Sequence, residues 1–338
     1  MVEQNFFSGE KIYKANIAVT YKCNQECLTC NIWKREAEEE LSKEQLKKFF
    51  QRNSYNKWLS LTGGEPFLRQ DLVEIVKSAE KELDSFYILN IPTNGQNQEK
   101  IVNDVKDILK LGIPNVIVSV SINGPKKLHD KISGRKESFE NALNTFKELK
   151  EIEETSNKFK TFLEYTQSPN NIGKFEETFE KVKEHVSITE KDFAVTFFHT
   201  SKHYYGNDGK KEGKNNVEEI VEKQRKLPKT PVQLVNQVFL ELAKDELEEN
   251  SLPCEALKSS VFIDPLGNVY PCVIDNTKIG NIVEESYSLE EMLDKVDKDK
   301  VLEKCQGCWL PCESNQRIMS NFSRSGIEYI KKRTNLKN

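Results

Sequence analysis

The sequence of 338 residues lacks a long apolar run, a large excess of one charge and a recognisable targeting signal. Its longest apolar stretches, such as 116–122, are far shorter than the roughly 20 residues that a membrane-spanning helix needs. Residues 1–14 include Glu3, Glu10, Lys11 and Lys14 and contain no signal-peptide core. The formal net charge of −4 gives no support to general binding of nucleic acids or membrane surfaces. These absences predict a cytoplasmic protein without a membrane span.

Cysteine is missing from the middle of the chain. Three of the eight cysteines lie within 23–30, five lie within 254–312, and none lies between these groups. Tight clusters in a cytosolic protein are typical of metal or redox sites rather than of a disulfide framework. No repeat or long low-complexity segment interrupts the chain.

The first cysteine group is Cys23, Cys27 and Cys30, with three and then two intervening residues, directly after a strand-like run at 17–20. Three thiolates can hold three irons of a cubic 4Fe–4S cluster. The fourth iron is then open to a substrate or cosubstrate, as in catalytic zinc sites. A structural zinc site lacks a fourth nearby ligand, because the closest histidine in the sequence is His129. Inert buried thiols are the remaining alternative.

Strand-like and helix-like segments alternate over the first 200 residues. Strands are expected at 17–20, 58–61, 86–91, 116–122, 161–165 and 193–198. Helices are expected from Ser42, where Gln45 completes a capping box, and at 72–79, 101–109, 139–149 and 172–182. This order predicts an α/β fold with a parallel sheet, and six units suit a partial (β/α)6 TIM-like barrel. The loops at 23–30, 63–66, 93–95 and 123–125 should therefore meet at one mouth.

The last part of the chain differs in composition. Apolar runs at 261–263 and 269–270 flank a turn and predict a hairpin that brings Cys254 and Cys272 within reach of each other. A helix is expected from Ser288, before Cys305, Cys308 and Cys312. We expect the partial barrel to span 1–210, a connecting loop and a helix beginning near 230–233 to span 211–250, and a small α+β domain to span 251–338.

The spacing Cys23, Cys27 and Cys30, together with Gly63-Gly64-Glu65-Pro66 after the second strand, resembles the radical S-adenosylmethionine (radical SAM) enzymes. The resemblance implies that the three cysteines bind a 4Fe–4S cluster and that SAM chelates its open iron through amino and carboxylate groups. It also implies that the backbone of 63–65 contacts the SAM amino group, since glycine lets the backbone approach a ligand closely. One departure is Thr29, where the family often has an aromatic residue.

The stretch 118–125, which reads VSVSINGP, also resembles the family. By this resemblance Ser119 or Ser121 binds the ribose or carboxylate of SAM, and Arg135 is a partner for its carboxylate. Thr93 and Asn94 are further candidates for the SAM site. The alternatives are ordinary hydroxyls packed in a barrel, a surface arginine and a simple turn at 94–95.

The second cysteine group resembles the auxiliary-cluster domains called twitch or SPASM. The matching residues are Cys254, Gly267, Cys272, Cys305, Cys308 and Cys312. The full SPASM pattern has more cysteines, so the resemblance implies a shortened domain with one auxiliary 4Fe–4S cluster. Its first-choice ligands are Cys254, Cys272, Cys305 and Cys308, and Cys312 could replace one of them. A zinc site is the alternative.

The resemblance implies an enzyme. One electron from an external donor such as ferredoxin or flavodoxin enters the first cluster, SAM is cleaved to methionine and a 5′-deoxyadenosyl radical, and the radical abstracts hydrogen from a substrate. The barrel begins within about 20 residues of Met1, which leaves no room for a leader-peptide-binding domain. We therefore expect a small-molecule substrate or a lipid or glycan precursor.

A peptide maturase is the alternative within the enzyme class, and the acidic balance argues against RNA modification. A non-catalytic iron–sulfur electron carrier or zinc scaffold is the alternative of another class, but it has no need of a SAM-binding glycine loop. After the sixth strand, His203 and Tyr205 are candidates for the substrate site, because they could orient a substrate or move a proton. They could equally pack under the loop that follows.

Overall fold

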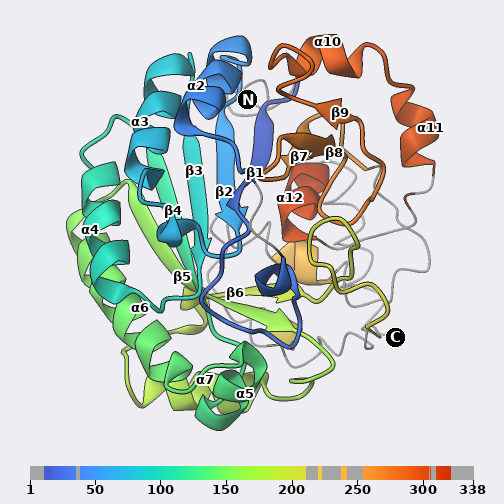
Figure 1. Ribbon diagram of the computed structural model, residues 1–338. Helices are drawn as coiled ribbons and strands as arrows, with labels where there is room; N and C mark the ends of the chain where they lie inside the picture. Colours follow the sequence, from blue (N-terminus) through green and yellow to red (C-terminus); the bar gives the residue numbers. More distant parts are fainter. Residues whose placement is uncertain are drawn as a thin grey trace.

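The computed structural model describes residues 11–35, 39–210, 220–222, 237–241, 254–303, 305 and 310–320 (Figure 1). Within these residues nine strands form one sheet in the order β6-β5-β4-β3-β2-β1-β7-β8-β9. The strands are β1 (Lys14–Thr20), β2 (Trp58–Gly63), β3 (Ile88–Thr93), β4 (Asn115–Ser121), β5 (Phe159–Gln167), β6 (Phe193–Phe197), β7 (Ser260–Ile263), β8 (Asn268–Tyr270) and β9 (Gly280–Asn281). Strands β1–β6 pair in parallel, and the sheet does not close. The partial α/β barrel is therefore confirmed.

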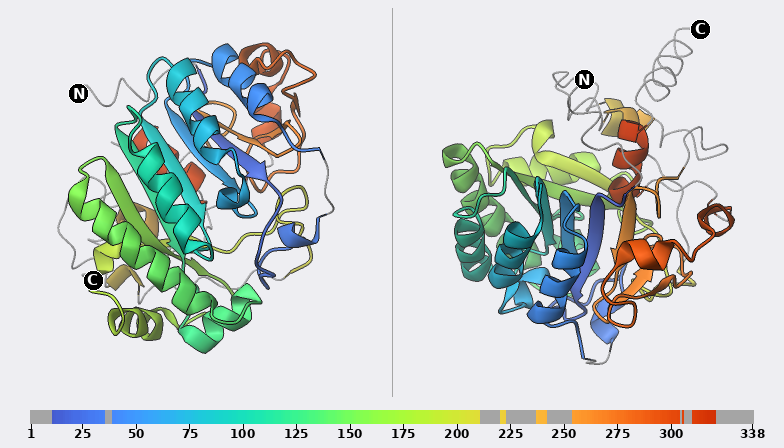
Figure 2. Two further views of the ribbon diagram at one scale, coloured as in Figure 1. Left: turned by 60° about the vertical axis from the view of Figure 1, so that its left-hand side comes forward. Right: turned by 90° about the horizontal axis from the view of Figure 1, so that it is seen from above.

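The helices between residues 43 and 183 cover one face of the curved sheet, as Figure 2 shows from two sides. The elements are η1 (Ile32–Lys34), α2 (Lys43–Arg52), η2 (Pro66–Leu68), α3 (Leu72–Glu82), α4 (Gln98–Ile108), α5 (Lys126–Ser133), α6 (Ser138–Thr155), α7 (Phe175–Lys183), η3 (Glu190–Asp192), α10 (Leu289–Leu293), α11 (Lys298–Leu302) and α12 (Pro311–Ser320). The capping box of Ser42 and Gln45 is present at the start of α2. None of the helices in the described residues is both long and apolar enough to cross a membrane.

One expected helix start is wrong. We predicted a helix over 172–182, but α7 begins at Phe175. Gly173 has a φ of +70°, which is a left-handed conformation that a continuing right-handed helix does not contain. Ile172 therefore lies before the helix, where its side chain is 39% exposed.

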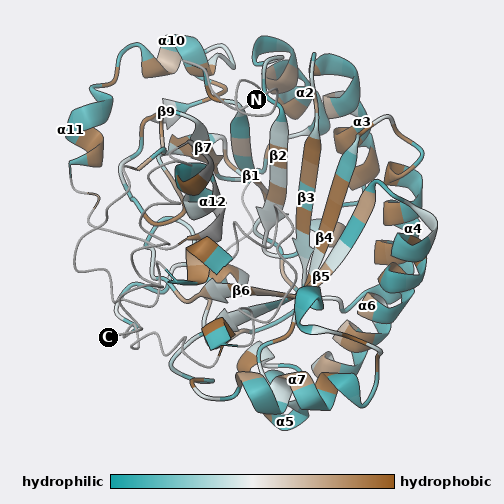
Figure 3. Ribbon diagram, turned by 180° about the vertical axis from the view of Figure 1, so that it is seen from behind, coloured by the Kyte–Doolittle hydropathy of each residue, from teal (hydrophilic) through white to brown (hydrophobic). Residues whose placement is uncertain are grey.

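The two faces of the sheet differ in burial. On the face toward the helices, Leu89, Val118 and Leu163 are completely buried. On the concave face, the alternating residues of β3 to β6 are mostly only partly buried. Figure 3 views the molecule from behind and shows hydrophilic residues among the apolar ones on these strands. The concave face is therefore the accessible interior of the partial barrel.

The C-terminal region extends the barrel sheet. Strand β7 pairs in parallel with β1, with Lys14 opposite Ser260 and Ile17 opposite Ile263. Strands β7 and β8 form the predicted antiparallel hairpin, with Phe262 opposite Tyr270. The predicted helix start near 230–233 lies outside the described residues. The proposed domain boundaries at 210 and 251 also border segments outside them.

Candidate active site at the mouth of the partial barrel

The loops after β1 and β2 are joined at the mouth by backbone hydrogen bonds. The N–H of Gly64 donates to Thr20 O at 2.8 Å, and the N–H of Glu65 donates to Lys22 O at 2.8 Å. A Cβ on Gly63 would lie 2.2 Å from Thr20 O, and one on Gly64 would lie 2.3 Å from Lys22 O. Only glycine allows this approach. The two glycines therefore hold the loop at 63–66, called the glycine loop below, directly against the start of the loop at 23–30, called the cysteine loop.

The Glu65 carboxylate links the β2 loop to the end of β3. It accepts hydrogen bonds from Thr93 Oγ1 at 2.9 Å, from the N–H of Asn94 at 2.7 Å and from the N–H of Phe67 at 3.2 Å. Its side chain is buried, and this burial raises the pKa of Glu65 to about 7 against the effect of the three donors. Thr93 and Asn94, predicted from sequence for the SAM site, therefore lie in contact with the glycine loop.

The three N-terminal cysteines lie partly buried in the loop after β1. Cys23 Sγ accepts a long hydrogen bond from Asn94 Nδ2 at 3.9 Å, and Cys30 Sγ accepts one from the N–H of Ile32 at 3.3 Å. Burial raises the pKa of all three thiols, that of Cys30 to about 11. Thiolates here therefore need a strong local positive charge, which the irons of a bound cluster supply. Donors to the sulfurs are also typical of iron–sulfur sites.

A single metal ion and a 4Fe–4S cluster require different arrangements of their cysteine ligands. Among the described residues, no group of three or more His, Cys, Asp or Glu side chains is placed to hold one metal ion. A structural zinc ion needs its ligands around one point. In a cubic 4Fe–4S cluster with four cysteine ligands, each cysteine binds a different iron. Cys23, Cys27 and Cys30 remain the predicted ligands.

The loop after β6 wraps around the cysteine loop. Asn31 donates from its N–H to Tyr205 O at 2.8 Å and from Nδ2 to Gly206 O at 2.7 Å. In the other direction, Asn207 Nδ2 donates to Thr29 O at 2.8 Å. Lys210 Nζ donates to Asn31 Oδ1 at 3.3 Å, which places one cation beside the cysteine loop. Sequence reasoning missed these asparagines, since single Asn residues in a polar loop carry no distinctive signal.

The sequence did not indicate the role that Tyr204 has in the structure. Its side chain is buried, and its hydroxyl donates to Gly63 O at 3.0 Å and lies 3.3 Å from Thr62 Oγ1. Burial raises its pKa, so the phenol stays protonated and can keep donating. Tyr204 therefore supports the glycine loop from the side of the β6 loop.

His203 lies against the C-terminal region. Its ring packs on Tyr270 with 4.2 Å between centroids, Nδ1 lies 2.9 Å from Asn276 Oδ1, and Nε2 lies 3.2 Å from Cys272 O. Burial lowers the pKa of His203. The Tyr205 ring packs at a tilt of 46° against the Tyr204 ring, with 4.7 Å between ring centroids. These contacts match the packing alternative for His203 and Tyr205, and their role at a substrate site stays a prediction.

The other predicted SAM residues surround the mouth. Arg135 Nη1 donates to Asn24 O at 2.9 Å, next to Cys23. Ser121 is the last residue of β4 and is partly exposed on the concave face. Ser119 lies two residues earlier on the same face of β4, and its hydroxyl donates to Glu164 Oε2 at 2.6 Å. Sequence reasoning missed Glu164, although a glutamate among alternating apolar residues of a strand was a usable signal.

Two cysteines of the second group meet in the C-terminal region. Cys305 Sγ lies 3.7 Å from Cys254 Sγ, and the hydrogen bond from Cys305 lowers the pKa of Cys254. Cys272 is buried, and its sulfur accepts from the N–H groups of Ile274 and Asp275, each at 3.4 Å. Cys308 and the side chain of Cys312 lie outside the described residues. The choice of four auxiliary ligands therefore stays a prediction.

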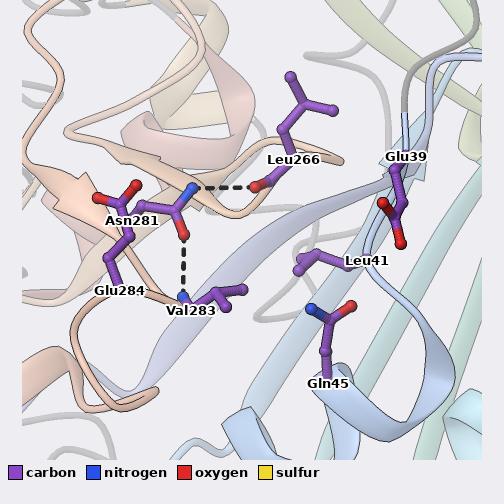
Figure 4. Close-up of a pocket in the computed structure, with 7 residues that line it drawn as sticks. All are labelled: Glu39, Leu41, Gln45, Leu266, Asn281, Val283 and Glu284. Carbon is purple, nitrogen blue, oxygen red and sulfur yellow. Dashed lines mark hydrogen bonds between the residues drawn. The ribbon is translucent and has the colours of Figure 1, made fainter.

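A separate surface depression of about 300 Å³ lies between the start of α2 and the β8–β9 region (Figure 4). Asn281 shapes it by donating from Nδ2 to Leu266 O at 2.9 Å and accepting from the N–H of Val283 at 2.9 Å. None of the predicted site residues lines this depression.

A cysteine-bearing loop held against a glycine loop at the mouth of a partial α/β barrel is the arrangement that we expect of an iron–sulfur protein with a ligand site beside its cluster. Comparison with known proteins identifies its family. Residues 17–182 match the radical SAM superfamily, and residues 254–309 match SPASM, an iron–sulfur cluster-binding domain. Residues 17–182 therefore form a radical SAM domain, and residues 254–309 form a SPASM domain. Both resemblances drawn from the sequence are confirmed, and the two domains imply 4Fe–4S clusters and SAM as cofactors.

Two curated relatives illustrate the similarity. The sporulation killing factor maturation protein SkfB of Bacillus subtilis is 33% identical over 138 residues, which cover 40% of this chain and 32% of SkfB. A probable GTP 3′,8-cyclase of Archaeoglobus fulgidus is 34% identical over 119 residues, which cover 33% of this chain and 36% of that protein. The chain thus matches about a third of the length of these relatives.

Solved structures share the fold over most of the chain. Streptococcus suis SuiB superposes with a TM-score of 0.61 at 17% identity, over 88% of this chain and 73% of SuiB. The structure of anSMEcpe with bound AdoMet superposes with a TM-score of 0.56 at 14% identity, over 94% of this chain and 99% of that chain.

Proposed function

We propose that this protein cleaves S-adenosylmethionine reductively and uses the resulting 5′-deoxyadenosyl radical to abstract hydrogen from a substrate. The observation that carries the proposal is the contact between the glycine loop and the cysteine loop, with N–H···O distances of 2.8 Å from Gly64 and Glu65. A simple electron carrier has no need for this loop beside its cluster. The electron comes from an external one-electron donor such as ferredoxin or flavodoxin.

The residues at the mouth take distinct roles in this proposal. Cys23, Cys27 and Cys30 would hold the cluster, which together with SAM supplies the radical when bound. The N–H groups of Gly64 and Glu65 already donate to the loop after β1. Backbone carbonyls of the glycine loop are therefore the groups that suit an amino group, which is a donor.

Polar side chains around the mouth suit the rest of SAM. Arg135 suits a carboxylate because a guanidinium pairs well with one. Ser121 offers a hydroxyl on the concave face, and Thr93 and Asn94 order the loop through Glu65. Pro66 opens η2 and fixes the chain direction after the glycines.

Two substrate classes have support. Similarity to SkfB, a maturation protein, supports a peptide. Similarity to GTP 3′,8-cyclases supports a small molecule, the class that we predicted together with lipid or glycan precursors. Incubation of the reduced enzyme with SAM and either peptides or nucleotides, followed by mass spectrometry of both pools, separates the two classes.

We also propose that the chain divides into a partial barrel (1–210), a connection (211–250) and an auxiliary-cluster domain (251–338). The family matches at 17–182 and 254–309 fall inside the first and last of these ranges. One auxiliary 4Fe–4S cluster in the last range would pass electrons if all its irons have protein ligands, or hold the substrate if one iron is open.

The deciding experiment is anaerobic reconstitution with iron and sulfide, reduction by dithionite, addition of SAM and chromatography for 5′-deoxyadenosine. The control replaces Cys23, Cys27 and Cys30 together by alanine. We expect product from the wild type only, and equal amounts from both proteins would refute the proposal. Iron analysis then tests the auxiliary cluster, since two 4Fe–4S clusters require about eight irons per chain and one requires about four.

A further inference from the structure

The carboxylate of Glu164 on β5 has no role in the site described so far. Leu163 and Tyr165, its neighbours in the strand, are completely buried on the helix-covered face. Side chains alternate along a strand, so Glu164 points to the concave face. It lies opposite Ser121, the last residue of β4, and three residues before the end of β5, so it stands just inside the mouth.

The side chains that flank Glu164 on the described part of the sheet are uncharged. Ser121 and Ala194 lie opposite it on the neighbouring strands. Phe162 and Thr166 precede and follow it on the same face of β5. All of these side chains are partly exposed, which shows that this part of the concave face is accessible.

Within the described residues, Glu164 makes one side-chain hydrogen bond, to the Ser119 hydroxyl at 2.6 Å, and forms no ion pair. Burial raises its pKa, and the hydrogen bond from Ser119 opposes this effect. Carboxylates taken out of water are normally paired with a cation or several donors. A carboxylate with a single neutral donor, beside a cofactor site, therefore has unused capacity to bind a ligand.

We propose that Glu164 binds a positively charged group of the substrate, an ammonium or a guanidinium, on the concave face of the sheet. This inference rests on the proposed function, because it requires a substrate beneath the SAM site. A cation paired with Glu164 would orient the neighbouring C–H bonds toward the mouth. The carboxylate also disfavours phosphate at this position, because like charges in a partly buried site repel.

The probes for a test are n-butylammonium chloride and its neutral counterpart 1-butanol. Both are titrated into the reconstituted, SAM-loaded enzyme, and dissociation constants are measured by saturation-transfer NMR. We expect Glu164→Gln to weaken n-butylammonium binding about tenfold, the loss expected when a hydrogen bond to a charged group is removed. The same variant should leave 1-butanol binding unchanged.

Two further variants make the result specific. Glu164→Asp keeps the charge and should retain part of the preference for n-butylammonium over 1-butanol. A purely structural role of Glu164 would not produce this retained preference. Glu154→Gln removes an equal charge from an exposed position on α6 and should change nothing. Thermal unfolding and iron content show whether each variant is folded and loaded.

A peptide probe shows whether the cation belongs to a peptide or to a small molecule. The peptide Ac-Ala-Lys-Ala-NH2 is compared with n-butylammonium. If the peptide binds more tightly to the wild type, and this difference in affinity is lost in Glu164→Gln, the cation is a basic side chain of a peptide. Preference for the free amine alone indicates a small molecule.

Equal binding of n-butylammonium to wild type and Glu164→Gln, or no binding of it at all, overturns the inference. Failure of the proposed function is a different result, since the wild type would then form no 5′-deoxyadenosine with dithionite and SAM.

Discussion

Replacement of Gly63 by alanine should separate the glycine loop from the cysteine loop. Gly63 has a φ of +146°, and a Cβ at this position would lie 2.2 Å from Thr20 O. The atom it meets belongs to the backbone of β1, which pairs with β2 as far as Thr20 and with β7 as far as Ile17. The strand cannot move aside, so the loop after β2 must shift.

The size of the effect follows from the contacts that are lost. A non-glycine residue in such a backbone conformation costs about 1–3 kcal/mol. The shift also breaks the hydrogen bonds from Gly64 and Glu65 to the loop after β1, each worth about 1 kcal/mol net. We therefore expect Gly63→Ala to lower the free energy of unfolding by about 3–5 kcal/mol.

The matched control is Gly173→Ala. Gly173 also has a positive φ, +70°, but a Cβ there meets nothing within 4 Å. It should cost only the backbone term, about 1–2 kcal/mol. Urea titrations give both free energies, and 5′-deoxyadenosine formation gives the activities. Activity should be lost in Gly63→Ala and kept in Gly173→Ala.

A Gly63→Ala protein with the stability of Gly173→Ala, or with full activity, would refute this account of the glycine loop. It would mean that close backbone approach is not what this position requires.

Three further predictions concern other parts of the site. Burial lowers the pKa of His129 to about 4, and its ring lies 3.0 Å from both the N–H of Asn123 and the hydroxyl of Ser138. Because the pKa is lowered in the folded state, the free energy of unfolding should fall as the pH drops from 6.5 toward 4. In urea titrations over this range, the wild type should lose about 3 kcal/mol of this free energy relative to His129→Gln. A constant difference between the two proteins would contradict this. Cys254→Ser should lower the iron content by about four per chain without abolishing 5′-deoxyadenosine formation, and unchanged iron would exclude Cys254 as an auxiliary ligand. Tyr204→Phe removes the donor to Gly63 O and should lower the free energy of unfolding by about 1 kcal/mol and raise the KM for SAM, whereas an unchanged KM would show that Tyr204 does not support the glycine loop.

Much of the barrel was predictable because its signals are local. Apolar periodicity located the helices α2, α3, α4 and α6, and strand-to-loop transitions located the four loops of the mouth. The start of α7 was misplaced because periodicity included Ile172 and ignored the conformation that Gly173 adopts. The spacing of Cys23, Cys27 and Cys30 with the glycine loop indicated the family, since these motifs depend on short chain segments. Ligand assignments within that family stay predictions.

The partners of individual side chains required the tertiary structure. Pairing of β7 with β1 joins residues about 245 positions apart. The hydrogen bonds of Glu65 to Thr93 and Asn94, and the approach of Tyr204 to Gly63, likewise join separate segments. The sequence alone therefore determined the family, the order of strands and helices, and the cofactors that the family implies. Only the tertiary structure decided which side chains meet at the mouth and which, like Glu164, face the open interior, because such contacts depend on how the whole sheet curves and packs rather than on neighbouring residues.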